Sequence, residues 1–226
     1  ENFKKSFNQF SVHEIAQFDE KKVEELMQNK GIVRNRRKIE ALEVFKMAYH
    51  SVIAAGFGGQ GVMLFGQILS MAAMFDGKFT TSLPSFGPEM RGGTANCTII
   101  ISDDYIASPV VDEPSEVVAF NLPSMIKFEK TLKENGILII NSSVIEKRPH
   151  REDIKIIKIP ANSIADELGN IKVSNMVMLG AYLKATKAVS FKSVEKALQE
   201  RLTGKKNEMI NINLEAIKAG MKEVVK

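Results

Sequence analysis

Two glycine-rich segments hold the residues whose types and spacing could do chemistry. The first, Gly56-Phe-Gly-Gly-Gln-Gly61, follows the apolar run 51–55 and precedes an apolar stretch of helical length. Glycines between a strand and a helix let bare backbone N–H groups approach a ligand, and a helix N-terminus favours an anion such as a pyrophosphate. The second segment, residues 84–97, carries Glu89 and Arg91 among Gly and Pro. Together they predict a site of backbone donors with a few charges.

The first segment is close to the dinucleotide-binding fingerprint, but a plain NAD site is disfavoured. Such a site needs an acidic residue at the end of the second strand, and here the expected strand 79–83 is followed by Pro84. A phosphate cradle does not depend on that acidic residue, so it stays one interpretation. The other is that the four glycines only permit tight packing of strand against helix.

The charged and sulfur-bearing residues of the second segment also have two interpretations each. Arg91 could hold a phosphate or carboxylate bidentately, or pair with Glu89 or Glu113 across a subunit interface. Cys97 is expected to be a small buried residue rather than a nucleophile. As the single cysteine of the chain, it excludes an internal disulfide and favours a cytoplasmic protein.

Composition excludes several other chemistries. One cysteine is too few for an iron–sulfur cluster, and the three histidines lie far apart, so no metal site is expected. No Gly-x-Ser-x-Gly elbow or Walker lysine motif occurs, so we expect no catalytic residue in this chain. A net charge of +4 spread over 226 residues argues against a nucleic-acid surface. No apolar run reaches the roughly 18 residues that a membrane span needs.

The elements that must position these segments alternate between strands and helices after residue 49. This alternation predicts a three-layer α/β/α fold with a mostly parallel sheet. A strand at 105–111, turning at Asp103-Asp104, is expected to pair back as a hairpin and make the sheet mixed. The other expected strands are 51–55, 79–83, 94–102, 116–120, 136–141 and 154–159, and the expected helices are 61–75, 124–133, 162–168, 175–186, 190–202 and 206–225.

The first 46 residues have a different pattern. Apolar residues at helical spacing predict two short helices, at 18–27 and 34–45, and no strand. We therefore divide the chain into a helical N-terminal extension, 1–46, and a main domain, 47–226. The basic cluster at 34–38 is interpreted as the solvated start of a helix rather than as a phosphate contact.

Four motifs follow one another in the main domain: Gly56-Phe-Gly-Gly-Gln-Gly-Val62, Pro84-Ser-Phe-Gly-Pro-Glu-Met-Arg-Gly-Gly-Thr-Ala-Asn-Cys97, Ile101-Ser-Asp-Asp-Tyr-Ile-Ala-Ser-Pro109 and Asn141-Ser-Ser143. They resemble the gamma subunit of 2-oxoacid:ferredoxin oxidoreductases, and the resemblance runs from about residue 47 to the C-terminus. The second motif is most similar to the 2-oxoglutarate type; pyruvate, branched-chain 2-oxoacids and indolepyruvate are alternative substrates. This second motif departs from many relatives at Phe86, where Tyr is more frequent.

The resemblance implies a part in the oxidative decarboxylation of a 2-oxoacid with coenzyme A (CoA) to an acyl-CoA, with electrons passing to ferredoxin. Thiamine diphosphate and iron–sulfur clusters would lie on partners, the alpha, beta and ferredoxin-like delta subunits. Glu89 and Arg91 would lie at the active-site entrance or a subunit interface. The implied CoA contacts are Gly56, Gly58, Gly59, Gln60 and Gly61.

The N-terminal extension is similar to something else. Residues 7–10, 12–16 and 31–39 resemble an internal stretch of DNA-3-methyladenine glycosylase I. The metal-binding and base-pocket positions of that family have no counterpart here, so neither glycosylase activity nor a nucleic-acid partner is expected. The extension is a natural fusion, a cloning joint or a wrong gene start.

The alternative function is a stand-alone module that binds CoA or a nucleotide. Such a module is expected to be monomeric. A subunit is instead expected to expose a large apolar contact surface around residues 84–97 or 105–125.

Overall fold

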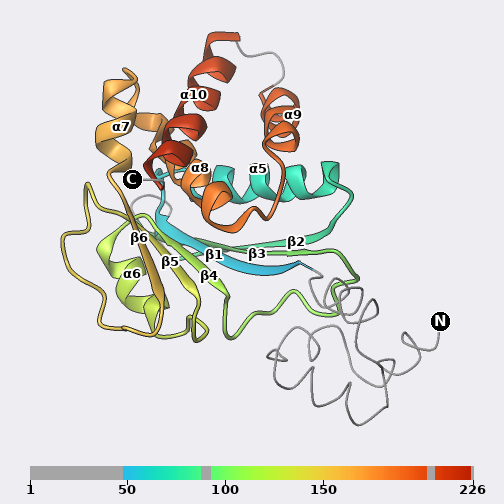
Figure 1. Cartoon of the computed structure of the whole chain (residues 1–226), viewed down its shortest axis with the longest axis vertical. Helices are drawn as coiled ribbons and strands as arrows, with labels where there is room; N and C mark the ends of the chain where they lie inside the picture. The colour runs from blue at the N-terminus through green and yellow to red at the C-terminus, as the bar shows by residue number, and fades with distance from the viewer. Residues whose placement is uncertain (1–47, 88–92, 203–206, 225–226) are drawn as a thin grey trace, which may run out of the picture. The chain divides into compact units, whose positions relative to one another are not determined.

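A six-stranded sheet with helices on both faces is built by the residues that the computed structural model describes, 48–87, 93–202 and 207–224 (Figure 1). The strand order is β2-β3-β1-β4-β5-β6. Strands β1, β4, β5 and β6 are mutually parallel, and β2 pairs antiparallel with β3, which confirms the expected mixed α/β fold. The strands are β1 (Tyr49–Phe57), β2 (Phe79–Phe86), β3 (Thr94–Ser102), β4 (Glu116–Ala119), β5 (Ile137–Asn141) and β6 (Lys155–Ile159).

Helices cover the two faces unequally. One face carries α5, α7, α8, α9 and α10, whose apolar side chains join the larger core, and the other carries α6, which joins a smaller core. The central strands contain the apolar runs 52–55, 117–119 and 138–140, as expected where both faces of a strand are covered. The helices are α5 (Val62–Phe75), α6 (Leu122–Glu129), α7 (Ala161–Glu167), α8 (Ser174–Thr186), α9 (Phe191–Arg201) and α10 (Asn207–Glu223), with a 3₁₀ turn η1 (Ile171–Val173) before α8.

Alternation along β1 shows how one strand serves both cores. Val52 and Ala54 pack into the larger core, whereas Ile53 and Ala55 pack into the smaller one. Successive side chains of a strand point to opposite faces, so a shift of one residue would exchange the two sets. The register Val52↔Glu116 to Ala55↔Ala119 between β1 and β4 is fixed in this way.

The prediction of a hairpin strand at 105–111 is wrong. Those residues form no strand, and β3 pairs with β2 instead, from Phe79↔Ser102 to Phe86↔Ala95. Pro109 removes a backbone donor from the expected strand, while β2 offers eight paired positions. The strand β2 also continues beyond its expected end at residue 83, because it lies at the edge of the sheet, where Pro84 is tolerated.

Two helices of the larger core meet backbone to backbone. A Cβ atom on Gly180 of α8 would lie 2.0 Å from the carbonyl oxygen of Ile217 in α10. One on Gly220 of α10 would lie 1.9 Å from the carbonyl oxygen of Val177 in α8. Both positions need glycine because the obstructing atoms belong to helix backbones, which cannot turn aside as a side chain can.

The chain divides into two compact units, Glu1–Tyr49 and His50–Lys226. The expected helical extension, with its basic cluster, lies outside the described residues, so its helices and the proposed division into domains stay predictions. None of the helices in the described part of the chain has the length and apolar character that a bilayer span requires.

Candidate functional site

The glycine segment lies where the sheet changes its direction of winding. From β1 the chain proceeds to β2 and β3 on one side of the sheet and to β4, β5 and β6 on the other. In open α/β sheets, ligands bind outside the carboxyl ends of the strands at such a switch point. The loops after β1 and β4 flank this point, and they contain Gly58–Gly61 and Asn121.

The loop itself is a tight turn with two left-handed residues. Gly59 has φ 99° and Gly61 has φ 77°, a region that other residues rarely adopt. Gly58 N–H donates to the carbonyl of Gly93 at 2.9 Å, and Gln60 N–H donates to the carbonyl of Phe57 at 3.1 Å. The loop is thereby fixed to the start of β3 and closed on itself.

Packing explains two of the four glycines. A Cβ on Gly56 would lie 2.7 Å from Gln60 Oε1, and a Cβ on Gly61 would lie 2.4 Å from Asn175 Nδ2. By contrast, Gly59 is exposed, and an added Cβ would meet nothing within 4 Å. Contacts with neighbouring side chains therefore leave no room for a Cβ at Gly56 or Gly61, whereas Gly59 faces open space.

The N-terminus of α5 has backbone N–H groups with no acceptor in the described part of the chain. Gly61 is its N-cap and supplies no side-chain hydrogen bond, and the first intrahelical bond runs from Phe65 N–H to the carbonyl of Gly61 at 3.0 Å. The preceding N–H groups of a helix have no intrahelical acceptor, and the helix dipole makes this end positive. The arrangement suits an anionic group.

The side chain of Gln60 is turned into the protein. Its Oε1 accepts from Phe57 N–H at 2.7 Å and from Asn121 Nδ2 at 3.0 Å, and its Nε2 donates to the carbonyl of Phe120 at 3.3 Å. Both ends of the amide are thus occupied by protein groups.

Neutral side chains continue along the same edge of the sheet. Asn141, buried at the end of β5, donates to Asn162 Oδ1 at 2.9 Å and accepts from Ser143 N–H at 3.2 Å. Among the described residues, no group of three or more His, Cys, Asp and Glu side chains could hold a metal ion. Cys97 is buried as expected, and burial raises the pKa of its thiol, which keeps it protonated.

The other predicted site residues stay predictions. Glu89 and Arg91 lie outside the described residues, so their neighbours are undetermined. The functional candidates that sequence reasoning missed are Asn121 and Asn175, which hold the glycine turn from two sides. Asn121 had a readable signal, since it is polar, follows a buried strand and precedes a helix with proline near its start.

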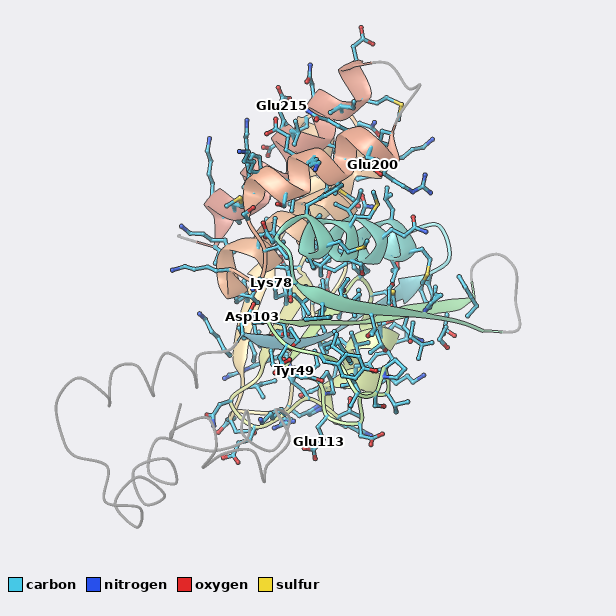
Figure 2. The ribbon with its side chains drawn as sticks, turned by 90° about the vertical axis from the view of Figure 1, so that its right-hand side faces the viewer. Tyr49, Lys78, Asp103, Glu113, Glu200 and Glu215 are labelled. Atoms are coloured by element: carbon cyan, nitrogen blue, oxygen red, sulfur yellow. The ribbon has the colours of Figure 1, made fainter. Side chains whose placement is uncertain are left out.

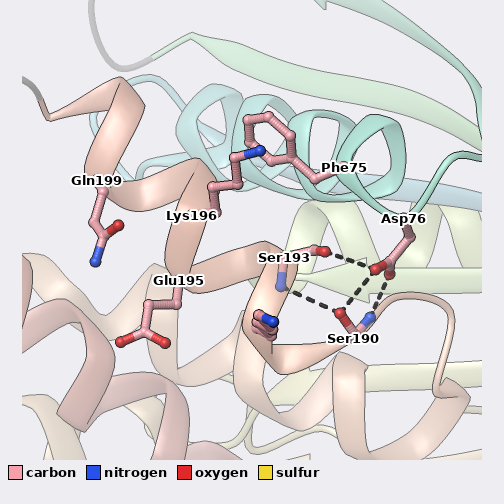
Figure 3. A pocket seen from close by; sticks show the side chains of 8 residues that line it. Phe75, Asp76, Ser190, Ser193, Glu195, Lys196 and Gln199 are labelled. Carbon is pink, nitrogen blue, oxygen red and sulfur yellow. Dashed lines mark hydrogen bonds between the residues drawn. The ribbon is translucent and has the colours of Figure 1, made fainter.

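An open pocket of about 520 Å³ lies at the opposite end of α5 (Figure 3). The polar groups in it hold two helices together. Asp76 follows α5 and accepts hydrogen bonds from Ser190 N–H at 2.6 Å, Ser190 Oγ at 2.8 Å and Ser193 Oγ at 2.6 Å. Its acceptor atoms tie α5 to the first turn of α9. Lys196 lies over the ring of Phe75, 4.1 Å from its centroid.

Replacing Asp76 with Asn is expected to lower the free energy of unfolding by about 1–2 kcal/mol at neutral pH. The effect is no larger because Asp76 is partly exposed and solvent screens its interactions. Partial burial alone would raise the pKa of Asp76, but hydrogen bonds from Ser193 and Ser190 lower it overall. The ionised carboxylate therefore stabilises the fold above the unfolded pKa, near 4, and this contribution is lost as the pH falls through the lower folded pKa. Chemical denaturation at several pH values should show the two proteins converging below about pH 4; a difference unchanged at pH 3 would contradict this role.

Apolar side chains are exposed on the hairpin of β2 and β3 and beside it. Phe79 is 50% exposed, Leu83 47%, Phe86 67% and Tyr105 72%, and these four residues are called the hairpin surface below. The rings of Phe79 and Tyr105 meet edge to face, with centroids 6.4 Å apart. At the start of the hairpin Lys78 pairs with Asp103 at 2.9 Å (Figure 2).

Comparison with known proteins identifies the class. Residues 51–223 match the family of pyruvate ferredoxin/flavodoxin oxidoreductases, and the chain belongs to this family. Residues 1–52 match the methyladenine glycosylase family, in agreement with the resemblance of that segment.

Relatives with similar sequence identity to this chain are named for different 2-oxoacids. The chain is 37% identical over 167 residues to ketoisovalerate oxidoreductase subunit VorA of Methanothermobacter marburgensis, covering 74% of this chain but 34% of the relative. It is 36% identical over 173 residues to 2-oxoglutarate synthase subunit KorC of Methanothermobacter thermautotrophicus, covering 74% of this chain and 90% of the relative. The chain thus spans about a third of VorA and most of KorC, and its similarity does not select a substrate.

Solved structures share the fold. The gamma subunit of a keto/oxoacid ferredoxin oxidoreductase from Geobacter sulfurreducens is 29% identical with a TM-score of 0.67, covering 78% of this chain and 98% of that one. The 2-oxoglutarate:ferredoxin oxidoreductase of Magnetococcus marinus, solved with 2-oxoglutarate, coenzyme A and succinyl-CoA, has a TM-score of 0.73. It is 22% identical, covering 78% of this chain and 31% of that one, and this likeness shows the fold alone.

Proposed function

We propose that this chain is the gamma subunit of a cytoplasmic 2-oxoacid:ferredoxin oxidoreductase that converts a 2-oxoacid, 2-oxoglutarate by preference, and CoA into an acyl-CoA. The observation that carries the proposal is the open glycine turn at the N-terminus of α5, placed at the switch point of the sheet in a chain of this family. The ligand we assign to the turn is the pyrophosphate of CoA.

The donors we assign are those with no hydrogen-bond acceptor among the described residues. Gly58 N–H and Gln60 N–H bond to protein carbonyls, so the pyrophosphate would be held by the N–H groups of Gly59, Gly61 and Val62. Because Gly59 faces open space, a phosphate can approach the backbone without meeting a side chain. Gly56 would contribute by leaving room for the Gln60 side chain.

The chemistry belongs to partner subunits. Thiamine diphosphate there would carry out the decarboxylation, and iron–sulfur clusters would pass the electrons to ferredoxin. This chain would orient CoA, and none of its residues is proposed as catalytic.

The hairpin surface supports a subunit rather than a stand-alone module. Phe86 and Tyr105 fall within the two ranges where the sequence predicts a contact surface, and Leu83 adjoins the first. On this half of the sheet α5 packs against one face of β2 and β3, while Phe79 and Leu83 belong to the opposite face. We propose that an alpha- or beta-type subunit covers these residues.

Anaerobic purification of the chain from its native cells tests this proposal. Mass spectrometry is expected to find thiamine-diphosphate-binding and ferredoxin-like subunits in stoichiometric amounts. Leu83→Glu is expected to lower their recovery at least about tenfold, because burying an unpaired carboxylate costs several kcal/mol. Met74→Glu, at a methionine that is 65% exposed on α5, is the matched control. A wild-type chain that elutes alone with CoA or a nucleotide bound would instead establish a stand-alone module.

A further inference from the structure

Gln60 connects the glycine loop to the strand on the other side of the switch point. Its amide makes three hydrogen bonds, one within the loop, to Phe57 N–H, and two to the segment after β4, to Phe120 and Asn121. Phe57 closes β1, so its N–H would lose its protein partner if the Gln60 side chain were shortened.

Asn121 fixes the other half of this connection. It is 5% exposed, and its Oδ1 accepts from Ser124 N–H at 2.9 Å as the N-cap of α6. Its Nδ2 is then directed to Gln60 Oε1 at 3.0 Å. One asparagine therefore serves α6 with one atom and the glycine loop with the other.

Gly56 leaves the space that the Gln60 amide occupies. Gly56 has no side chain, and a Cβ there would lie 2.7 Å from Gln60 Oε1 and 2.9 Å from the Cβ of Phe120. Between two residues with positive φ, Gly59 and Gly61, the backbone of the loop has more freedom than an ordinary turn. A side chain bonded on three sides restrains that freedom.

We propose that Gln60 is a positioning residue, which through Asn121 locks the glycine loop in the conformation that directs its free N–H groups at the CoA pyrophosphate. This inference rests on the proposed function and assigns the Gln60 side chain a role other than ligand contact. Positioned donors bind an anion without an ordering cost, so loosening the loop weakens CoA binding without touching the chemistry.

Two variants, studied in the assembled complex, test whether Gln60 positions the glycine loop through Asn121. Gln60→Met keeps the length of the side chain and removes all three hydrogen bonds. Asn121→Asp keeps the N-cap of α6, since Asp caps helices as well as Asn does, but it cannot donate to Gln60. Each is expected to raise KM for CoA about tenfold, the effect of losing roughly 1–2 kcal/mol of hydrogen bonding, while KM for the 2-oxoacid stays unchanged. Gln67→Met, at an exposed glutamine of α5, is the control.

Amide hydrogen exchange on the full chain gives a readout besides activity. In Gln60→Met the amides of residues 57–61 are expected to exchange at least about tenfold faster, because Phe57 N–H loses its acceptor. If both variants lower thermal stability and change all kinetic constants together, Gln60 is merely structural and the inference is wrong. If Gly59→Asp raises KM for CoA and these variants do not, the inference fails while the proposed function stands. If Gly59→Asp, Gln60→Met and Asn121→Asp all leave KM for CoA unchanged, the proposed function itself fails.

Discussion

Gly59→Asp is expected to abolish CoA-dependent turnover of the assembled complex. A carboxylate about 4 Å from the pyrophosphate would repel it by about 4 kcal/mol at an effective dielectric constant near 20, a factor of the order of 10³ in CoA affinity. The fold should survive, because an added side chain at Gly59 meets nothing within 4 Å. Titration of turnover against CoA concentration measures the effect.

Two controls separate charge from backbone strain. Gly77→Asp introduces the same side chain at another open glycine of positive φ, 73°, at the far end of α5, about 20 Å from the loop for a helix of this length. Gly59→Asn introduces a side chain of nearly the same shape, with the same backbone strain, but without the charge. We expect both to retain most of the CoA affinity. Equal losses in Gly59→Asp and Gly77→Asp would contradict the phosphate role of the loop.

The second large effect is expected at the contact between α8 and α10. Gly180→Ala and Gly220→Ala each place a methyl group about 2 Å from a carbonyl oxygen of the facing helix. The helices must move apart, and we expect a loss of about 3 kcal/mol or more in the free energy of unfolding. Urea denaturation followed by circular dichroism measures it.

An alanine substitution on the exposed side of α8 provides the comparison. Lys184→Ala, at an exposed position, is expected to change stability by less than about 0.5 kcal/mol. If Gly180→Ala were as stable as this control, the close backbone contact between the two helices would be refuted.

The order and type of most elements could be predicted from the sequence because their signals are local. Runs such as 117–120 and 137–140 are apolar throughout, and asparagine or glycine stands next to them. The pairing of β2 with β3 could not be predicted in this way. It depends on which of two partners, 79–86 or 105–111, lies beside β3, and that is decided by tertiary contacts rather than by alternation within either segment.

The position of the candidate site between β1 and α5 could be predicted from the sequence, but its internal hydrogen bonds could not. Four glycines between a strand and a helix predict either a backbone-donor site or tight packing, and the sequence alone does not decide between them. That Gln60 turns inward depends on Phe120 and Asn121, some 60 residues away in the chain, and no local pattern contains that information. The same holds for Asn175, which reaches Gly61 from α8.

The measurement that tests the central claim most directly is a structure of the purified complex with CoA bound, solved by cryo-electron microscopy. We predict that the CoA pyrophosphate lies within hydrogen-bonding distance of the N–H groups of Gly59, Gly61 and Val62, with the Gln60 amide still bonded to Asn121. A pyrophosphate bound by another subunit, with the glycine loop facing protein or solvent alone, would contradict the account.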